Sequence, residues 1–167
     1  MYHDEIDVDD LQINALHRVI LTKVDDKGDQ QLVNYKGLEG EEHTEVLRIQ
    51  PFGFSSVPPK DSEALVASLG TRDMPVVLGA EHPDHRPKNL KDGAFRNYDK
   101  SGAYVESDGE GNMTMKNAKG TFKMDKDGNI TAEGKSLTFK GPITIEGDID
   151  HKGNLTSTGN HKAAAHV

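Results

Sequence analysis

A six-residue period runs through residues 137–159, which read LTFKGPITIEGDIDHKGNLTSTG. Glycine recurs at Gly141, Gly147, Gly153 and Gly159. Large aliphatic residues keep the same spacing of six, at Leu137, Ile143, Ile149 and Leu155. Between the glycines, apolar and polar residues alternate, which is typical of a half-buried strand. A fixed period of this kind marks a structural repeat, so the stretch predicts short strands separated by glycine bends.

This repeat cannot build a core within one chain. From residue 106 to the end, roughly a dozen large apolar residues are spread over about sixty positions. Their burial, at about 25 cal/mol per Å² of apolar area, does not offset about 1.5 kcal/mol of ordering entropy per residue. Identical copies wound about a common axis would share a core and join their free strand edges. We therefore expect a homo-oligomeric β-fibre or β-prism, and specifically a homotrimer.

The composition narrows the possible functions. The 167 residues allow one ordinary domain, or a small domain with an extension. Seventeen glycines and no tryptophan are typical of turns and repeats, which lowers the prior for an enzyme. The absence of cysteine excludes thiolate chemistry and fits synthesis in a reducing cytoplasm. A net charge of −8 argues against nucleic acid as the main partner, because phosphate binding requires basic clusters.

The first residues suggest no targeting segment. Residues 1–11 are acidic, which fits neither a secretory nor a mitochondrial signal. No run in the chain approaches the roughly 20 apolar residues of a membrane-spanning helix. We expect the protein to be soluble when it is made.

The residues that follow predict a small β-barrel. Strands are expected at residues 15–24, 31–35, 45–49, 63–69 and 75–80, with turns rich in glycine, proline and aspartate between them. Residues 63–69 would also fit a helix, but their alternation and the break at Gly70 favour a strand. Five or six short strands in about eighty residues favour a barrel of the oligonucleotide/oligosaccharide-binding (OB) type, over about residues 12–90.

Four strings in this region resemble one known protein family. They are RIQPFGFSSVP from Arg48, EALVASLGTRD from Glu63, VVLGAEHPDHRP from Val76 and LKDGAFRNYD from Leu90. In order and spacing they closely resemble the Mu-type bacteriophage baseplate assembly protein V family, the central tail spikes of contractile-tailed phages. The resemblance covers about residues 12–102, and the glycine repeat resembles the family's tail in style.

The resemblance implies a mechanical function and no enzymatic activity. It implies an N-terminal OB barrel that trimerises and docks on the baseplate hub under the tail tube, followed by an elongated trimeric β-helix needle. Sheath contraction would drive this spike through the host outer membrane, so the protein would be assembled in the host cytoplasm and reside in the virion baseplate. The expected division is an acidic arm at 1–11, the OB domain at 12–90, a linker or start of the stalk at 91–105, the trimeric spike at 106–160 and the tip at 161–167.

The tip departs from the family pattern. The family commonly ends in a His-x-His pair, so that three chains place six imidazoles around one axial iron ion. Here the end carries His161 and His166 without that pair. A threefold axis still gathers three copies of each histidine, and two such layers would suit a first-row transition metal. The alternatives are that His151, His161 and His166 are solvated polar residues, or that another protein caps the spike.

Other candidate sites have simpler interpretations. His82 and His85 flank Pro83 and Asp84 in what we interpret as a polar interdomain loop, although this set could also bind metal. Residues 25–29 and 125–129 resemble calcium loops but lack the glutamate that such loops need, so we interpret them as β-turns. No catalytic motif is present.

Phe52 and Phe54 lie in a proline-bounded loop and could form a base-stacking surface. The acidic balance instead favours packing at a barrel or trimer interface.

Two alternatives from other functional classes remain open. One is a hexapeptide-repeat acyltransferase with a left-handed β-helix, which needs about eighteen residues per coil and several coils. The clean period here covers little more than one such coil. The other is an OB-fold nucleic-acid binder with a flexible tail, for which a basic groove would be the distinguishing feature. Both predict that the tail is not an interchain β-fibre.

Overall fold

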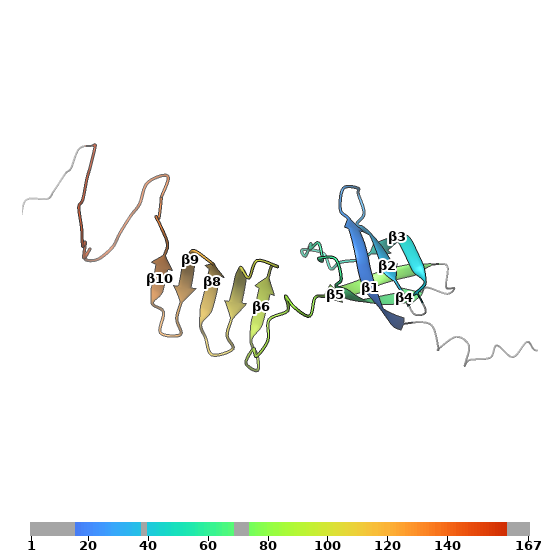
Figure 1. Cartoon of the computed structure of the whole chain (residues 1–167). Coiled ribbons are helices and arrows are strands. Elements are labelled where there is room, and N and C mark those ends of the chain that lie inside the picture. Colours follow the sequence, from blue (N-terminus) through green and yellow to red (C-terminus); the bar gives the residue numbers. More distant parts are fainter. Residues whose placement is uncertain (1–15, 38–39, 69–73, 160–167) are drawn as a thin grey trace, which may run out of the picture. The chain divides into compact units, whose positions relative to one another are not determined.

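The structure is a computed structural model that describes residues 16–37, 40–68 and 74–159. Within these ranges the structure has ten β-strands and no α-helix. The first five close into a barrel and the last five form an open antiparallel sheet (Figure 1). Contacts within the chain divide it into two compact units, and the boundary in the sequence lies between Lys135 and Ser136. The predicted all-β class and the predicted closed barrel are confirmed.

Five strands form the barrel through four antiparallel pairings and one parallel pairing. Its strands are β1 (Leu16–Asp25), β2 (Leu32–Lys36), β3 (Glu42–Arg48), β4 (Glu63–Ser68) and β5 (Pro75–Glu81). The order around the barrel is β1-β2-β3-β5-β4, closed by the pairing of β4 with β1. Strand β3 lies parallel to β5, and the other neighbouring strands are antiparallel.

This connectivity places several loops at one end of the barrel. Strands β1, β3 and β5 run in the same direction, because β3 is parallel to β5 and β4 is antiparallel to both β1 and β5. The β1–β2 turn, the long β3–β4 connection and the exit of the chain after Glu81 therefore lie at the same end. We call this the exit end of the barrel.

The barrel has a core of its own. Side chains alternate across each strand, so every second residue points inward. Leu21, Val33, Val66 and Val77 are completely buried, and Tyr35 is nearly so. The ring of Tyr35 also stacks on His43, with 4.7 Å between the ring centroids. Strand β4 confirms the strand interpretation of residues 63–69 over the helical one.

The open sheet, which we call the meander sheet, is built from consecutive hairpins. Its strands are β6 (Phe95–Tyr98), β7 (Tyr104–Ser107), β8 (Met113–Asn117), β9 (Gly120–Met124) and β10 (Ile130–Glu133). Each strand pairs in antiparallel fashion with the next along the chain. Strand β6 and the start of β7 fall in the stretch that the sequence assigns to a linker or the start of the stalk.

Residues 136–159, which we call the glycine tail, carry no strand in the single chain. Figure 1 shows them as straight runs joined by sharp bends. Gly141, Gly147 and Gly153 have nearly equal φ angles of 125°, 128° and 129°. Only glycine adopts such angles readily, because it has no Cβ. The predicted glycine bends are therefore present, whereas the predicted strands have no pairing partner within the described part of this chain.

Candidate functional site: the apolar face of the meander sheet

The register of the meander sheet sorts its side chains onto two faces. Residues directly opposite each other in an antiparallel pair project to the same side of the sheet. Val105 lies opposite Met115, and Met115 lies opposite Phe122. Phe122 in turn lies opposite Ala132 on the edge strand β10. One continuous apolar row therefore crosses four strands.

The same face carries further apolar residues two positions along β8, β9 and β10, and Phe95 on β6, while Asn97 on β6 and Ser107 on β7 are its polar members. We define the apolar face as Phe95, Val105, Met113, Met115, Phe122, Met124, Ile130 and Ala132. Its seven large side chains are between 40% and 60% exposed in the single chain. Burying one such side chain fully is worth about 1.5–3 kcal/mol. A sheet needs a second layer against its apolar face, and the described residues supply none to this sheet.

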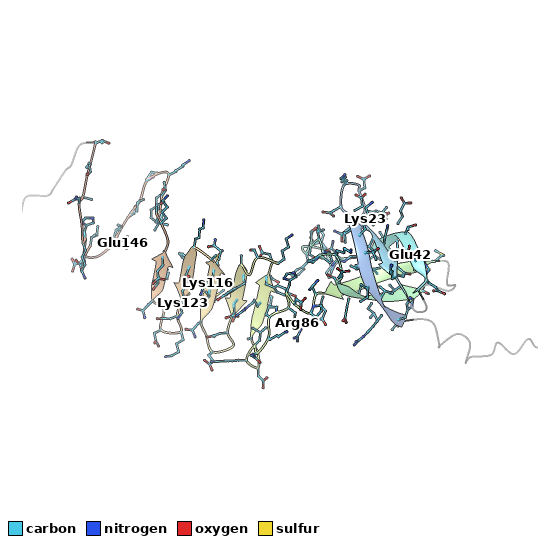
Figure 2. The ribbon with its side chains drawn as sticks, in the orientation of Figure 1. Lys23, Glu42, Arg86, Lys116, Lys123 and Glu146 are labelled. Carbon is cyan, nitrogen blue, oxygen red and sulfur yellow. The ribbon has the colours of Figure 1, made fainter. Side chains whose placement is uncertain are left out.

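The opposite side of the sheet is polar. We define the polar face as Arg96, Tyr98, Tyr104, Glu106, Thr114, Lys116, Thr121, Lys123, Thr131 and Glu133. Figure 2 labels Lys116 on β8 and Lys123 on β9. Arg96 forms an ion pair with Glu106 across the β6–β7 pairing, and its guanidinium carbon lies 4.1 Å from the centroid of the Tyr104 ring. This face therefore satisfies its polar groups against itself and water.

Three turns of the meander sheet share one hydrogen-bonding pattern. Asp99, Asp108 and Asp125 each use Oδ1 to accept from the backbone N–H groups two and four residues further on. A glycine with positive φ follows three residues after each aspartate, at Gly102, Gly111 and Gly128. The calcium-like string at residues 125–129 is thus a β-turn, as predicted.

These hydrogen bonds stabilise the ionised carboxylates. The pKa of Asp125 lies below its ordinary value because the Asn129 side chain and then the Asn129 backbone N–H donate to it. The pKa of Asp108 is lowered by the backbone N–H of Glu110 and by the Asn112 side chain.

Asn112 also links two turns. Its Oδ1 accepts from the backbone N–H of Lys126, with 3.1 Å between the two atoms, while its Nδ2 donates to Asp108. The turn after β7 is therefore tied to the turn after β9. This bond adds to the strand pairing that holds the apolar face in a fixed geometry.

The glycine tail exposes apolar side chains in the same way. They are Leu137, Phe139, Ile143, Ile145, Ile149 and Leu155, each between 58% and 73% exposed. Their alternation is that of strands, yet the backbone of this segment has no strand partner among the described residues, so its side chains and its backbone both face solvent. Like the apolar face, the tail therefore exposes apolar side chains that no other described part of the chain covers.

The histidines singled out from the sequence are placed as follows. His161 and His166 lie outside the described residues, so the predicted metal site at the tip stays a prediction. His151 is exposed in the glycine tail. The rings of His82 and His85 lie 4.5 Å apart, and Nδ1 of His82 accepts from the backbone of Asp84. Within the described ranges, no group of three or more potential ligand side chains is arranged to hold a metal ion.

The two phenylalanines of the β3–β4 connection do not pack into the barrel of their own chain. Phe52 is completely exposed and Phe54 is 60% exposed.

The turn at residues 25–29 is a hairpin turn in which Asp25 accepts from the backbone of Lys27, as predicted. Across residues 16–37, 40–68 and 74–159, no helix is long and apolar enough to cross a membrane.

Sequence reasoning missed the extent of the apolar face. The signal is a 17-residue repeat that relates residues 108–124 to residues 125–141. It matches Asp108, Gly111, Asn112 and Thr114 with Asp125, Gly128, Asn129 and Thr131, and Thr121-Phe122-Lys123 with Thr138-Phe139-Lys140. The repeat therefore assigns Phe139 of the tail to the position that Phe122 occupies on β9.

Two comparisons with known proteins find similarity to the same phage protein. Residues 18–84, which include most of the barrel, match the family model for the N-terminal region of bacteriophage Mu Gp45. The chain is also 30% identical over 141 residues to a protein of Escherichia phage Mu described as "Baseplate puncturing device gp45". That alignment covers 83% of this chain and 70% of the Mu protein. The chain belongs to the Mu-type baseplate spike protein family. The family predicted from the four strings is thereby confirmed.

Proposed function

We propose that three copies of this chain form the central spike of a phage baseplate, which pierces the host outer membrane when the tail sheath contracts. The observation that carries this proposal is the exposed apolar face of the meander sheet, backed by a polar face that is complete on its own. Three such sheets around one axis would bury their apolar faces together and leave their polar faces in water. The family relationship, and the name of the Mu protein, support a role in puncturing.

In this proposal the glycine tail continues the same shared core as a β-helical needle. The 17-residue repeat supports this, because it assigns the tail residues Thr138, Phe139 and Lys140 to a strand like β9. The recurring φ of about 125–129° every six residues would give each chain the regular bends that winding about an axis requires. Backbone groups that are unpaired in one chain would then pair with the neighbouring copies.

A mechanical role gives this architecture a physical purpose. Force along the axis of an interchain β-structure loads many hydrogen bonds together, and each contributes about 1 kcal/mol. We assign the five-stranded barrel to the OB type and propose that it docks on the baseplate hub and tail tube. The protein would thus act without catalysis, in the virion, after assembly in the host cytoplasm. Nucleic-acid binding is not favoured, because the exposed loop that bears Phe52 and Phe54 carries no charge.

We further propose that His161 and His166 hold a transition-metal ion on the threefold axis, with imidazole as the donor. Elemental analysis of the purified trimer is expected to find one iron ion for three chains. A His161→Ala/His166→Ala variant is expected to lose that ion and remain trimeric. Metal-free wild-type trimers would disprove this part of the proposal and leave the spike function intact.

Light scattering of the full-length protein tests the assembly directly. The expected mass is about 55 kDa, three times the 18.3 kDa chain. Met115→Asp places a charge in the middle of the apolar face, where each trimer would bury three such charges, and is expected to abolish the trimer. Thr114→Asp introduces the same charge on the polar face and should leave the trimer intact. A monomeric wild-type protein, or equal behaviour of the two variants, would contradict the proposal.

A further inference from the structure

The barrel also exposes large apolar side chains, and all but Met74, which lies directly before β5, fall into two sets. The first lies on the β3–β4 connection at the exit end of the barrel and consists of Ile49, Phe52, Phe54 and Val57, which we call the phenylalanine loop. The second lies on the outside of β1, β4 and β5 and consists of Leu16, Ile20, Leu65 and Leu78, which we call the outer aliphatic face. The loop protrudes from the end of the barrel, and the aliphatic face lies on its wall.

The phenylalanine loop is held in place by a buried polar network. Arg48 is only 8% exposed and Gln31 only 7%. The Arg48 guanidinium donates to the Gln31 side-chain oxygen and to the backbone oxygen of Ser56, the latter at 2.8 Å. Gln31 donates to the same Ser56 oxygen, at 3.0 Å. Gln50 then accepts from the backbone N–H of Ser56. The base of the loop is therefore fixed from both sides.

The tip of the loop is apolar and uncharged. No charged residue occurs between Arg48 and Lys60, in a chain of which 29% is charged. The bend at Gly53, with a φ of 87°, presents Phe52 to solvent. Aromatic residues are enriched and charges depleted at the centres of protein interfaces. A contact residue held in one conformation also loses less entropy on binding. The loop thus has the properties of a preorganised protein-binding element.

The outer aliphatic face is arranged to receive such an element. Leu65 lies opposite Gly79 on the outer side of the β4–β5 pair, so the position beside it carries no side chain. A Cβ atom placed on Gly79 would meet no atom within 4 Å. Leu78 flanks this bare position at the irregularity in the β4–β5 register. On β1, Arg18 lies opposite Leu65 and between Leu16 and Ile20, so this face also carries a charge. An aromatic ring can therefore approach the backbone here between aliphatic neighbours.

We propose that the phenylalanine loop of one copy packs on the outer aliphatic face of the next copy, so that three barrels close into a ring. This inference rests on the proposed trimer. In a cyclic trimer, like residues meet only at the threefold axis, and a contact between neighbouring copies away from the axis joins two unlike surfaces. One barrel offers one protruding and one flat apolar surface, which are the two unlike halves that such a ring needs. A second copy of this chain is therefore the occupant of both surfaces.

Cross-linking of the full-length chain tests the contact, because the native sequence contains no cysteine. The double variant Ser55→Cys/Gly79→Cys keeps both phenylalanines and adds one thiol to each surface. With a short bis-maleimide, it is expected to give covalent dimers and trimers on denaturing gels. Each single variant should stay a single-chain band, because in the proposed ring both positions lie away from the threefold axis, where like positions of different copies do not meet. Ser55→Cys/Glu42→Cys, with the second thiol on β3, is the matched control and should not cross-link between chains.

The possible results of this experiment distinguish failure of the ring contact from failure of the proposed trimer. Light scattering before cross-linking reports the assembly. A trimer that shows no interchain product from Ser55→Cys/Gly79→Cys would overturn the ring contact and leave the spike proposal standing. Cross-linking of Ser55→Cys alone, or of the Glu42→Cys control, would also overturn it. Adding Phe52→Ser and Phe54→Ser to the double variant is expected to remove most of the interchain product, and its persistence would show that the loop is not the contact.

Discussion

The barrel and the meander sheet are built from the same alternation of apolar and polar residues, yet they treat their apolar side chains differently. Leu21 on β1 is 0% exposed, whereas Phe122 on β9 is 47% exposed. The barrel closes on itself, so its inward side chains meet one another. The meander sheet is open, and the described residues place no second layer against its apolar side chains, which stay about half exposed. Alternation thus specifies strands and faces, and closure decides whether one chain suffices to make a core.

The largest predicted effect on stability comes from substituting Phe122, on the apolar face of the meander sheet. If the apolar face is buried between copies, Phe122→Ala is expected to destabilise the trimer by about 3–5 kcal/mol per chain, the range for buried aromatic residues. Denaturant unfolding followed at several protein concentrations would measure it, because the stability of an assembled core depends on concentration.

Thr121→Ala on the polar face is the control for Phe122→Ala and should change the stability little. An equally small effect for Phe122→Ala would mean that the face stays exposed in the assembled protein, which contradicts a shared core.

The corresponding test in the barrel is a substitution of Leu21, which is completely buried. Leu21→Ala is expected to lower the free energy of unfolding of the barrel by about 2–5 kcal/mol, since it leaves a cavity among fully buried neighbours. Because this core lies within one chain, the loss should be the same at every protein concentration. A concentration-dependent loss would show that the barrel, too, depends on its neighbours for stability. Hydrogen exchange of the amides on β1 and β4 would assign the effect to the barrel.

Much of the fold could be predicted from local pattern. The turn at residues 25–29, the proline at position 51 and the alternation in residues 63–69 predicted the strands of the barrel, because these signals act within a few residues. The parallel pairing of β3 with β5 depends on contacts far apart in sequence and left no such signal. The start of β3 at Glu42, three residues before the predicted position, reflects its pairing with Lys36 on β2.

The candidate site could be predicted only in part. The six-residue period of the tail indicated a shared core, since glycine and aliphatic residues at fixed spacing leave too little apolar surface for one chain. The apolar face of the meander sheet was missed because its members come from five strands, and only the register shows that they share one side. Phe52 was recognised from its loop, but the buried network of Arg48 and Gln31 that holds the base of this loop was not, because its members lie far apart in sequence.

The regular bends of the glycine tail can be tested by substitution. Gly147 has a φ of 128°, which residues with a side chain rarely adopt, so Gly147→Ala is expected to cost about 1–3 kcal/mol per chain. The change should make the tail of the trimer more sensitive to protease and to detergent. Gly134→Ala is the matched control, because Gly134 does not have such a φ and has free space around it. Equal resistance of both variants would show that the bends at every sixth residue are not kept in the needle.

The smallest expected effect concerns the turns of the meander sheet. The pKa of Asp125 in the folded protein is lowered from 3.8 by hydrogen bonds from Asn129, so its ionised form stabilises the folded turn. That contribution is present above the unfolded pKa and is lost as the pH falls through the lowered folded value. Asp125→Asn should therefore flatten the loss of thermal stability between about pH 5 and pH 2, measured by circular dichroism. If Asp125→Asn instead retains the wild-type profile, acid acts on other carboxylates, and the turn does not depend on the charge of Asp125.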